Sequence, residues 1–545
     1  MKKRMISILL VLGMVLGLMT GCKGKDASSN NSNGKKKLTV GVQQNVNISD
    51  YDDNAFTKYI EEALDIELEF VYFISDTNEA LQQLTLMTSG NKELPDVLCG
   101  FWGLGAYNAN AFGEDGYFVD LSELVEKYAV NYKAKYENLP EEDKQVLDAN
   151  IINTTDGGWY GMPMYAESGK AGMDNIEQMV FINQTWLDRL GLKMPTTIEE
   201  LYTVCQAFAT QDPNGNGMAD EIPILGASGI EYDISAYLIN AFVYYDITYP
   251  LNVTDGKVWD PVSTDEYRQA LIYANKLCKE GLLSDMCYTM TSSNEFKTML
   301  SPVDDIARVG IWCGHPDVYT SAETEILDEY VTLPALGGKT DKGGYTVVRP
   351  NPCYLSCFIT KDCEDTETAM KFIDFFYLDE TVTRSRRGEE GVDWKDVAGT
   401  NNYGTESHVK VVNDQAFFKG NTTWGRNLCG IQTGYNYSAN ASEEGETGKI
   451  AEVSRLAQQL YSNMVNGKKP EELISRVVYS SEEYEERSEY DKIYKDYVVA
   501  QRALFITDAL DPNSDSDWNA YLDELKNLGQ ETLISTAQSA YNRMK

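Results

Sequence analysis

The chain has 545 residues with 47 basic and 84 acidic side chains, which gives a formal net charge of -37. This length exceeds one ordinary domain and predicts several structural units or two large lobes. With 43% hydrophobic and 24% charged residues, the composition is that of a folded globular protein. The negative charge argues against nucleic acid as a partner, because phosphate binding requires a surface rich in Lys and Arg. The chain has only two histidines, which limits histidine-based catalysis and multi-histidine metal sites.

The start of the chain predicts a secretory signal. A basic stretch at residues 2–4 precedes an apolar run at 6–19. As a helix that run would span about 21 Å, which is too short for a hydrocarbon core of about 30 Å. It ends in Met-Thr-Gly-Cys22, which resembles a bacterial lipobox. We therefore expect residues 1–21 to be removed as a signal peptide and Cys22 to receive lipid; an ordinary signal with an incidental cysteine is the alternative.

The next segment predicts a tether. Residues 22–37 begin with the lipidated cysteine and are rich in Gly, Ser, Asn and Lys, so they cannot form a packed core. No later apolar run approaches a membrane-spanning length. The sequence therefore predicts a protein on the extracellular face of the cell membrane, held there by its lipid anchor only.

Nine further cysteines follow Cys22. An odd number leaves at least one unpaired, and the spacing is not that of a disulfide scaffold. Cys353, Cys357 and Cys363 are close enough to suggest a metal site, but no histidine or CxxC motif accompanies them. We expect buried thiols that pack as small hydrophobic groups.

The hydrophobic pattern predicts alternating strands and helices. Strand-like runs at 38–42, 68–73 and 95–98 are separated by helical spacing at 51–63 and 79–88. Such alternation is typical of an α/β sheet with crossover helices. Later helices are expected at 264–280, 366–378 and 448–464, and in the segment 482–545. Thr197 and Glu200 form a capping-box pattern for a helix that continues through Phe208.

The segment 212–221 carries the strongest local metal signal. Side-chain oxygens occur at alternate positions 1, 3 and 5, and a glycine stands at position 6. Position 12 is Pro223 where an EF-hand has glutamate, so Glu221 would have to replace that ligand. A turn without metal is the alternative interpretation. The ligands expected for a structural Ca²⁺ are Asp212, Asn214, Asn216, the Met218 carbonyl, Asp220 and Glu221.

Several stretches together resemble a known family. Among them are WLDRLGLKMPTTIEE at 186–200, DPNGNGMADEIP at 212–223, LMTSGNKELPDVL at 86–98 and DGGWYGMPMY at 156–165. These are similar to the extracellular solute-binding lipoproteins of sugar ABC importers, in their large calcium-loop-containing branch. The resemblance spans nearly the whole mature chain.

This resemblance implies a fold of the periplasmic-binding-protein type, a two-lobed α/β clamp with crossing hinge segments. Lobe one would contain residues 38–164 and 326–385, and lobe two would contain 165–325 and 386–545. The calcium of the loop would be structural and would lie in lobe two, with the six ligands named above.

Candidate ligand residues follow from the residue types that sugars require, which are aromatic platforms beside planar hydrogen-bonding groups. Some of the chosen positions lie at the end of the first strand, in a glycine-rich turn or at the first expected crossing between the lobes. The others follow the strand-like run at 309–311 or lie in late loops of lobe two. Each could instead be a core or lid residue. They are Gln43, Asn45, Trp159, Tyr165, Glu167, Trp312, His315, Trp394 and Trp424.

The function that the resemblance implies is capture of a carbohydrate, chiefly an oligosaccharide, by hinge closure and its delivery to an ABC permease. The protein would be a monomer and would do no chemistry on its ligand. One alternative is a secreted glycosidase or lyase with two catalytic carboxylates. Another is a ligand-sensing surface receptor of the same fold. The sequence does not distinguish import from sensing.

Overall fold

The structure is a computed structural model of the whole chain and describes residues 35–543 with short gaps. The predicted signal peptide, Cys22 and most of the tether lie outside the described residues, and so does His315. The internal gaps are 46, 152–156, 168–178, 228–231, 249, 291–292, 315–323, 338–342, 348–352, 401–405, 414–415, 417–419, 426–427, 435–448, 475–476 and 478.

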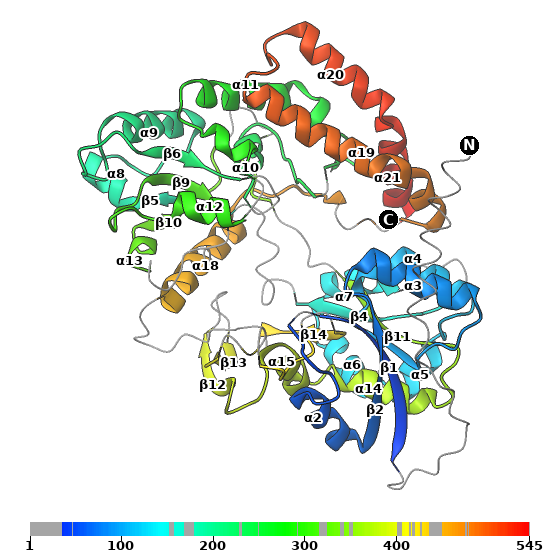
Figure 1. Cartoon of the computed structure of the whole chain (residues 1–545). Coiled ribbons are helices and arrows are strands. Elements are labelled where there is room, and N and C mark those ends of the chain that lie inside the picture. The colour runs from blue at the N-terminus through cyan, green and yellow to red at the C-terminus, as the bar shows by residue number, and fades with distance from the viewer. Residues whose placement is uncertain are drawn as a thin grey trace, which may run out of the picture.

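Two bodies make up the molecule, each built around one sheet (Figure 1). The first sheet has the strand order β14-β4-β11-β3-β1-β2, in which β11 runs antiparallel to β3 and β4. The other adjacent pairs are parallel. Its strands are β1 (Lys36–Gln43), β2 (Ile66–Phe73), β3 (Val97–Cys99), β4 (Met162–Ala166), β11 (Tyr354–Ile359) and β14 (Gly430–Gln432).

Helices pack around this first sheet. Among them α14 contacts α5, α6 and β11, while α4 and α7 contact β11. Their bounds are α2 (Ala55–Leu64), α3 (Thr77–Ser89), η1 (Trp102–Leu104), α4 (Gly105–Glu114), α5 (Ser122–Tyr128), α6 (Val130–Glu137), α7 (Glu141–Ile151), α14 (Thr366–Phe375) and α15 (Asp379–Arg387). A hairpin of β12 (Trp394–Thr400) and β13 (Glu406–Val411) follows α15.

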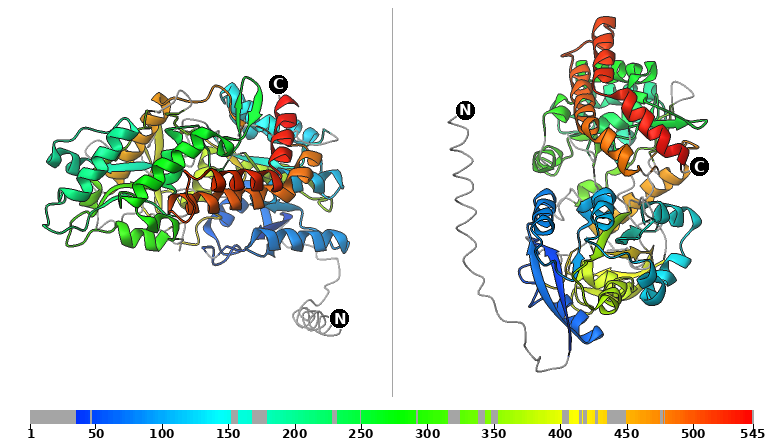
Figure 2. Two further views of the ribbon diagram at one scale, coloured as in Figure 1. Left: turned by 90° about the horizontal axis from the view of Figure 1, so that it is seen from above. Right: turned by 90° about the vertical axis from the view of Figure 1, so that its right-hand side faces the viewer.

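The second sheet has the order β10-β5-β9-β6. Its strands are β5 (Val180–Asn183), β6 (Ile222–Leu225), β9 (Val309–Cys313) and β10 (Tyr330–Thr332), and a separate hairpin is formed by β7 (Asn252–Thr254) and β8 (Lys257–Trp259). The surrounding helices are α8 (Gln184–Leu190), α9 (Ile198–Thr210), α10 (Ile234–Asn240), η3 (Pro261–Ser263), α11 (Asp265–Lys279), η4 (Asp285–Tyr288), α12 (Ser293–Leu300), α13 (Thr324–Leu327), α18 (Lys449–Asn466), α19 (Ser481–Ile506), α20 (Asp515–Asn527) and α21 (Gln530–Arg543). Figure 2 shows the red C-terminal helices in the same body as the green ones.

Local sequence explains where α9 begins. The Thr197 side chain accepts a hydrogen bond from the Glu200 amide at 3.2 Å, as an N-cap residue does. The Glu200 carboxylate reaches one residue further back than expected and accepts from the Thr196 amide at 2.8 Å. These bonds satisfy amide groups that the first turn of a helix leaves without partners.

Each body has its own hydrophobic core. In the second body Trp186 is 1% exposed and its ring meets the edge of Phe208 at a centroid distance of 5.1 Å. Burial of one such large side chain contributes about 1.5–3 kcal/mol before entropy is subtracted. In the first body, side chains of β1, β3 and β11 share a core with α14. The predicted two-lobed α/β fold is confirmed.

The lobe boundaries differ from those expected. β10 and residues up to 347 belong to the second lobe: β10 pairs with β5, and the Tyr345 amide donates to the Asn240 carbonyl at 3.3 Å. The segment from Trp424 to β14 belongs to the first lobe and not the second, since Trp424 is in its core and β14 extends its sheet. The chain therefore passes between the lobes three times: after β4, after residue 347 and after β14.

Most of the nine cysteines beyond Cys22 are buried, as the sequence predicted. Cys99 and Cys357 face each other across β3 and β11 with their Sγ atoms 3.3 Å apart. Within the described part of the chain, no helix combines the length and apolar character that a membrane crossing requires.

Candidate functional site

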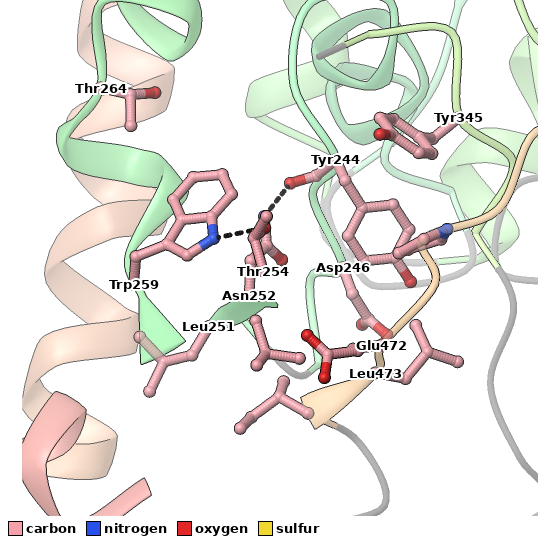
Figure 3. A pocket seen from close by; sticks show the side chains of 13 residues that line it. Tyr244, Asp246, Leu251, Asn252, Thr254, Trp259, Thr264, Tyr345, Glu472 and Leu473 are labelled. Carbon is pink, nitrogen blue, oxygen red and sulfur yellow. Dashed lines mark hydrogen bonds between the residues drawn. The ribbon is translucent and has the colours of Figure 1, made fainter. Parts of the chain in front are cut away.

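A cavity of about 440 Å³ lies in the second lobe (Figure 3). Its walls come from the loop after α10, the β7–β8 hairpin, Tyr345 and the segment 470–474. The volume is in the range of small-molecule sites. The lining residues are Tyr244, Asp246, Leu251, Asn252, Val253, Thr254, Trp259, Thr264, Tyr345, Pro470, Glu472, Leu473 and Ile474.

The β7–β8 hairpin forms one wall. Its two turn residues, Asp255 and Gly256, both have positive φ (52° and 75°), as a two-residue type I′ hairpin turn requires. The register pairs Asn252 with Trp259, so both side chains lie on the same face of the hairpin. The Trp259 indole N–H donates to Thr254 Oγ1 at 3.0 Å, which fixes the ring orientation.

Glu472 holds the hairpin in place. Its carboxylate accepts from the Gly256 amide at 2.9 Å and from the Tyr541 hydroxyl at 2.5 Å. Gln538 of α21 donates to the Gly256 carbonyl at 3.0 Å. The wall is thus fixed by residues far away in the chain.

The opposite wall depends on the end of α10. The Asn240 side chain bonds both backbone groups of Tyr245, at 3.0 and 2.7 Å, which fixes the loop that carries Tyr244. The rings of Tyr244 and Tyr345 meet edge to face at 5.6 Å. Lys468 lies over the Tyr345 ring, with Nζ 4.0 Å from its centroid. The tyrosine rings therefore stand in defined orientations beside the cavity.

This arrangement suits binding of a molecule with flat apolar faces and a polar rim. Trp259, Tyr244 and Tyr345 supply aromatic surface, while Asp246 and Glu472 supply carboxylates. Among the described lining residues there is no histidine, cysteine, lysine or arginine. None of these cavity residues was among the predicted ligand residues, although Asp255-Gly256 between two alternating runs is a strong hairpin signal.

Three predicted ligand residues of the first lobe lie outside this cavity. Gln43 and Asn45 are half-buried at the carboxyl end of β1, where the sequence placed them. Asn45 Oδ1 accepts from the Asn47 amide at 2.9 Å. Trp159 is half-buried; its indole N–H donates to the Gly161 carbonyl at 2.7 Å. Their contact with a ligand stays a prediction.

Tyr165 and Glu167 are both buried at the end of β4. Tyr165 is 2% exposed, and its hydroxyl donates to Asp143 Oδ1 at 2.8 Å. Glu167 is buried, and its amide donates to the Gln432 carbonyl at 2.8 Å, next to the β4–β14 pair. Contact of these two side chains with a ligand stays a prediction.

The later predicted tryptophans are also buried. Trp312 lies in the central strand β9 and packs against Phe181 at a centroid distance of 4.4 Å. Trp424 donates to Thr57 Oγ1 at 2.8 Å inside the first core. Trp394 is 5% exposed, donates to a backbone carbonyl and lines a second, smaller cavity. Contact of these three tryptophans with a ligand stays a prediction.

Amide groups of the predicted calcium loop donate hydrogen bonds to side-chain oxygens of the same loop. Asp212 accepts from the Asn216 and Gly217 amides at 3.1 and 3.0 Å, and Gly217 has a φ of 75°. The side-chain amides of Asn214 and Asn216 donate to Asp220 Oδ1 at 3.1 and 3.0 Å. These contacts bring the side chains at positions 1, 3, 5 and 9 together, as the spacing predicted.

Glu221 beside this loop is poorly satisfied. Its Oε1 atom is buried and accepts no hydrogen bond within the described structure. Burial raises the pKa of its carboxyl, and the negative charges of Asp212 and Asp220 raise that pKa further. The acidic side chains alone do not complete a metal site: among the described residues, no three His, Cys, Asp or Glu side chains are arranged to hold a metal ion. Oxygens of Asn214, Asn216 and the backbone would have to contribute.

Comparison with known proteins identifies the class of the chain. Residues 47–272 match the family model for the bacterial extracellular solute-binding protein. Over these residues the chain is similar to the bacterial extracellular solute-binding proteins. A relative that aligns along nearly the whole length of this chain is the fructooligosaccharide ABC transporter substrate-binding protein FusA of Streptococcus pneumoniae serotype 4, with 23% identity over 97% of this chain and 96% of the relative.

Solved structures of similar fold support the two-lobed architecture of this chain. An HMO-binding, ABC-transporter-associated solute-binding protein of Bifidobacterium longum infantis aligns with a TM-score of 0.71 and 22% identity, over 93% of this chain and 99% of that chain. An EF-hand mutant of S. pneumoniae FusA in complex with fructo-nystose aligns with a TM-score of 0.66 and 20% identity, over 93% and 99%. At these identities the likeness establishes the fold.

Proposed function

We propose that this protein is the substrate-binding lipoprotein of an ABC importer and captures an oligosaccharide without altering it. The observation that carries the proposal is the cavity with Tyr244, Trp259 and Tyr345 on its walls. Aromatic faces suit the C–H faces of sugar rings. The sugar-binding relatives named above support the same ligand class.

The proposed mechanism is capture by closure. The ligand binds one lobe first and then contacts the other, and its greater affinity for the closed arrangement shifts the population toward it. The three passages of the chain between the lobes would act as the hinge. The closed form would dock on a permease, and a separate ATPase would supply the energy.

Calorimetric titration of the mature chain with neutral oligosaccharides tests the proposal. Wild type is expected to show saturable binding of at least one of them. Trp259→Ala should weaken that binding by about tenfold or more, because it removes an aromatic platform. Tyr202→Ala, on α9 outside the cavity, is the matched control and should leave affinity unchanged. A folded wild-type protein that binds no glycan would refute the proposal, and chromatographic detection of cleaved sugar would favour the enzyme alternative.

The lipid anchor is part of the same proposal. Cys22 in its lipobox-like setting would hold the protein on the extracellular face of the membrane. Cys22→Ala is expected to move the protein from the membrane fraction to the culture medium. An unchanged membrane fraction would argue against lipidation at this residue.

We propose further that Ca²⁺ binds the loop 212–221 as a structural ion. The ligands would be Asp212, Asn214, Asn216, the Met218 carbonyl, Asp220 and Glu221. The buried Glu221 Oε1 without a hydrogen-bond partner supports this, because a cation would satisfy it. Because both amide nitrogens now donate to Asp220, the ion would require the amide oxygens in their place.

Thermal unfolding in calcium and in chelator tests this metal site. Wild type should melt several degrees higher in calcium, since a ligand that binds only the native state stabilises it. Glu221→Gln should lose most of that rise, yet in chelator it should melt no lower than wild type, because it removes a repelled charge. Glu199→Gln on α9 is the control. Equal melting of wild type with and without calcium would refute the site.

A further inference from the structure

One polar atom of the cavity has no partner. Asn252 is 5% exposed and lines the cavity beside Trp259. Its Oδ1 is buried and accepts no hydrogen bond within the described structure. An unsatisfied buried acceptor is costly, so native structures rarely keep one unless another molecule pairs with it.

The hydrogen bond of the Asn252 side-chain nitrogen determines how this amide is oriented. Asn252 Nδ2 donates to the Tyr244 carbonyl at 2.7 Å (Figure 3). A carbonyl requires a donor, so the nitrogen must lie on that side and the oxygen on the other. Exchange of the two atoms would place two acceptors against each other. The unpaired end of the Asn252 amide is therefore a fixed acceptor, and the group that pairs with it must be a donor.

The cavity also contains two acidic side chains, beside the hydroxyl groups of its Tyr and Thr residues. Asp246 and Glu472 contribute carboxylates, and the Glu472 carboxylate already accepts from the Gly256 amide and the Tyr541 hydroxyl. The Trp259 N–H, a donor at the rim, is used by Thr254. Since the described lining holds no lysine or arginine, a carboxylate on the ligand would meet the like charges of Asp246 and Glu472 with no counterion among the lining residues; Lys468, over the Tyr345 ring, is the nearby cation.

We infer that this cavity is a subsite for one neutral, hydroxyl-rich sugar unit, in which Trp259 supports the ring face and Asn252 Oδ1 accepts a hydrogen bond from a ring hydroxyl. The inference rests on the proposed function and adds to it the class of sugar and a specificity-determining residue. Uronic acid units are excluded from this subsite by Asp246 and Glu472. Sugars that lack the matching hydroxyl bind more weakly, because they leave the Asn252 oxygen unpaired.

The test begins with calorimetric titration of the mature wild-type chain with kestose, maltotriose, xylotriose, cellotriose and trigalacturonate. A neutral trisaccharide should bind, and trigalacturonate should bind at least tenfold more weakly than it. The best neutral trisaccharide is then compared with its monodeoxy derivatives. One derivative should lose about 10- to 100-fold in affinity for wild type.

Asn252→Ala, measured with the parent sugar and its deoxy derivative, completes a double-mutant cycle between protein and ligand. The variant should bind the parent sugar about 10- to 100-fold more weakly, and it should no longer distinguish the parent from the critical deoxy derivative. Because the Asn252 amide also holds the Tyr244 loop, Asn275→Ala serves as a control for loss of a buried asparagine that bonds backbone carbonyls outside the cavity. Circular dichroism spectra like that of wild type are required of both variants.

The outcomes separate the two proposals. If wild type binds a neutral sugar but Asn252→Ala discriminates between the parent and the deoxy sugars as wild type does, the subsite is wrong and the proposed function stands. Preferred binding of trigalacturonate also overturns the subsite alone. If wild type binds none of the sugars, both the proposed function and the subsite are overturned.

Discussion

At the scale of single residues, His408 is the clearest titrating group. It lies on β13 with Nδ1 3.0 Å from Asp396 and Nε2 3.3 Å from Glu406, and the cavity that it lines also contains acidic side chains of α15. The hydrogen bond to Asp396 is the main reason why its pKa is raised above the ordinary value of 6.5. The two ion pairs therefore stabilise the β12–β13 hairpin at low pH, and this contribution is lost as pH rises through the raised pKa.

An NMR titration of the imidazole measures this pKa. The chain has only two histidines, so His315→Gln leaves His408 as the single signal. We expect a midpoint above 6.5, and a lower one in Asp396→Asn. Asp188→Asn, on α8 in the other lobe, should leave the midpoint unchanged. A midpoint at or below 6.5 would contradict the assigned ion pairs.

At the scale of elements, a buried ion pair joins α10 to α19. Arg502 bonds Asp233, which is also the N-cap of α10 and accepts from the Ser235 amide at 2.9 Å. The two side chains are 2% and 10% exposed. Removal of one charge leaves the other buried without its partner, which costs about 3–5 kcal/mol.

Arg502→Met should therefore lower the free energy of unfolding of the second lobe by about 3 kcal/mol. The double variant with Asp233→Asn should recover more than half of that loss, because asparagine still caps the helix and no unpaired charge remains. Denaturant unfolding followed by circular dichroism measures both. A double variant as unstable as the single one would show that packing of the arginine stem, and not its charge, is what α10 requires.

Sequence pattern predicted the elements better than the site. The helices expected at 264–280 and 448–464 are found at Asp265–Lys279 and Lys449–Asn466, because an apolar stripe and a cap are local features. The sequence did not show that Trp312 lies in a strand buried on both faces, because a tryptophan in such a strand looks the same in sequence as one at a binding site.

The cavity could not be predicted because its walls come from three separate parts of the chain. Residues 244–264, Tyr345 and 470–474 meet only after the second lobe has folded, and Gln538 fixes one wall from a helix near the C-terminus. The lobe boundaries failed for a similar reason. β14 has only three residues, too few for a periodic signal, and its place in the first sheet depends on pairing with β4.

At the scale of the whole molecule, one contact joins the two lobes on the side of the C-terminal helices. Tyr107 of α4 stacks on Tyr484 of α19 at a centroid distance of 4.4 Å and an angle of 20°. Its hydroxyl donates to Glu485 Oε1 at 3.0 Å. A stacked aromatic pair is worth about 0.5–1.5 kcal/mol beyond its buried area, which is about a two- to tenfold bias toward the arrangement that forms it.

Loss of this contact should let the two lobes sample a wider range of distances from each other. Tyr107→Ala is expected to broaden the pair-distance distribution in small-angle X-ray scattering of the ligand-free protein and to raise its radius of gyration. Tyr107→Phe keeps the stacked ring and loses only the hydrogen bond to Glu485, so its effect should be smaller. Tyr136→Ala, whose ring lies on α6 within the first lobe, is the control and should scatter like wild type. If Tyr107→Ala also scatters like wild type, the hinge segments alone set the distance between the lobes. A ligand must then close the clamp against the stiffness of these segments and not against the α4–α19 contact.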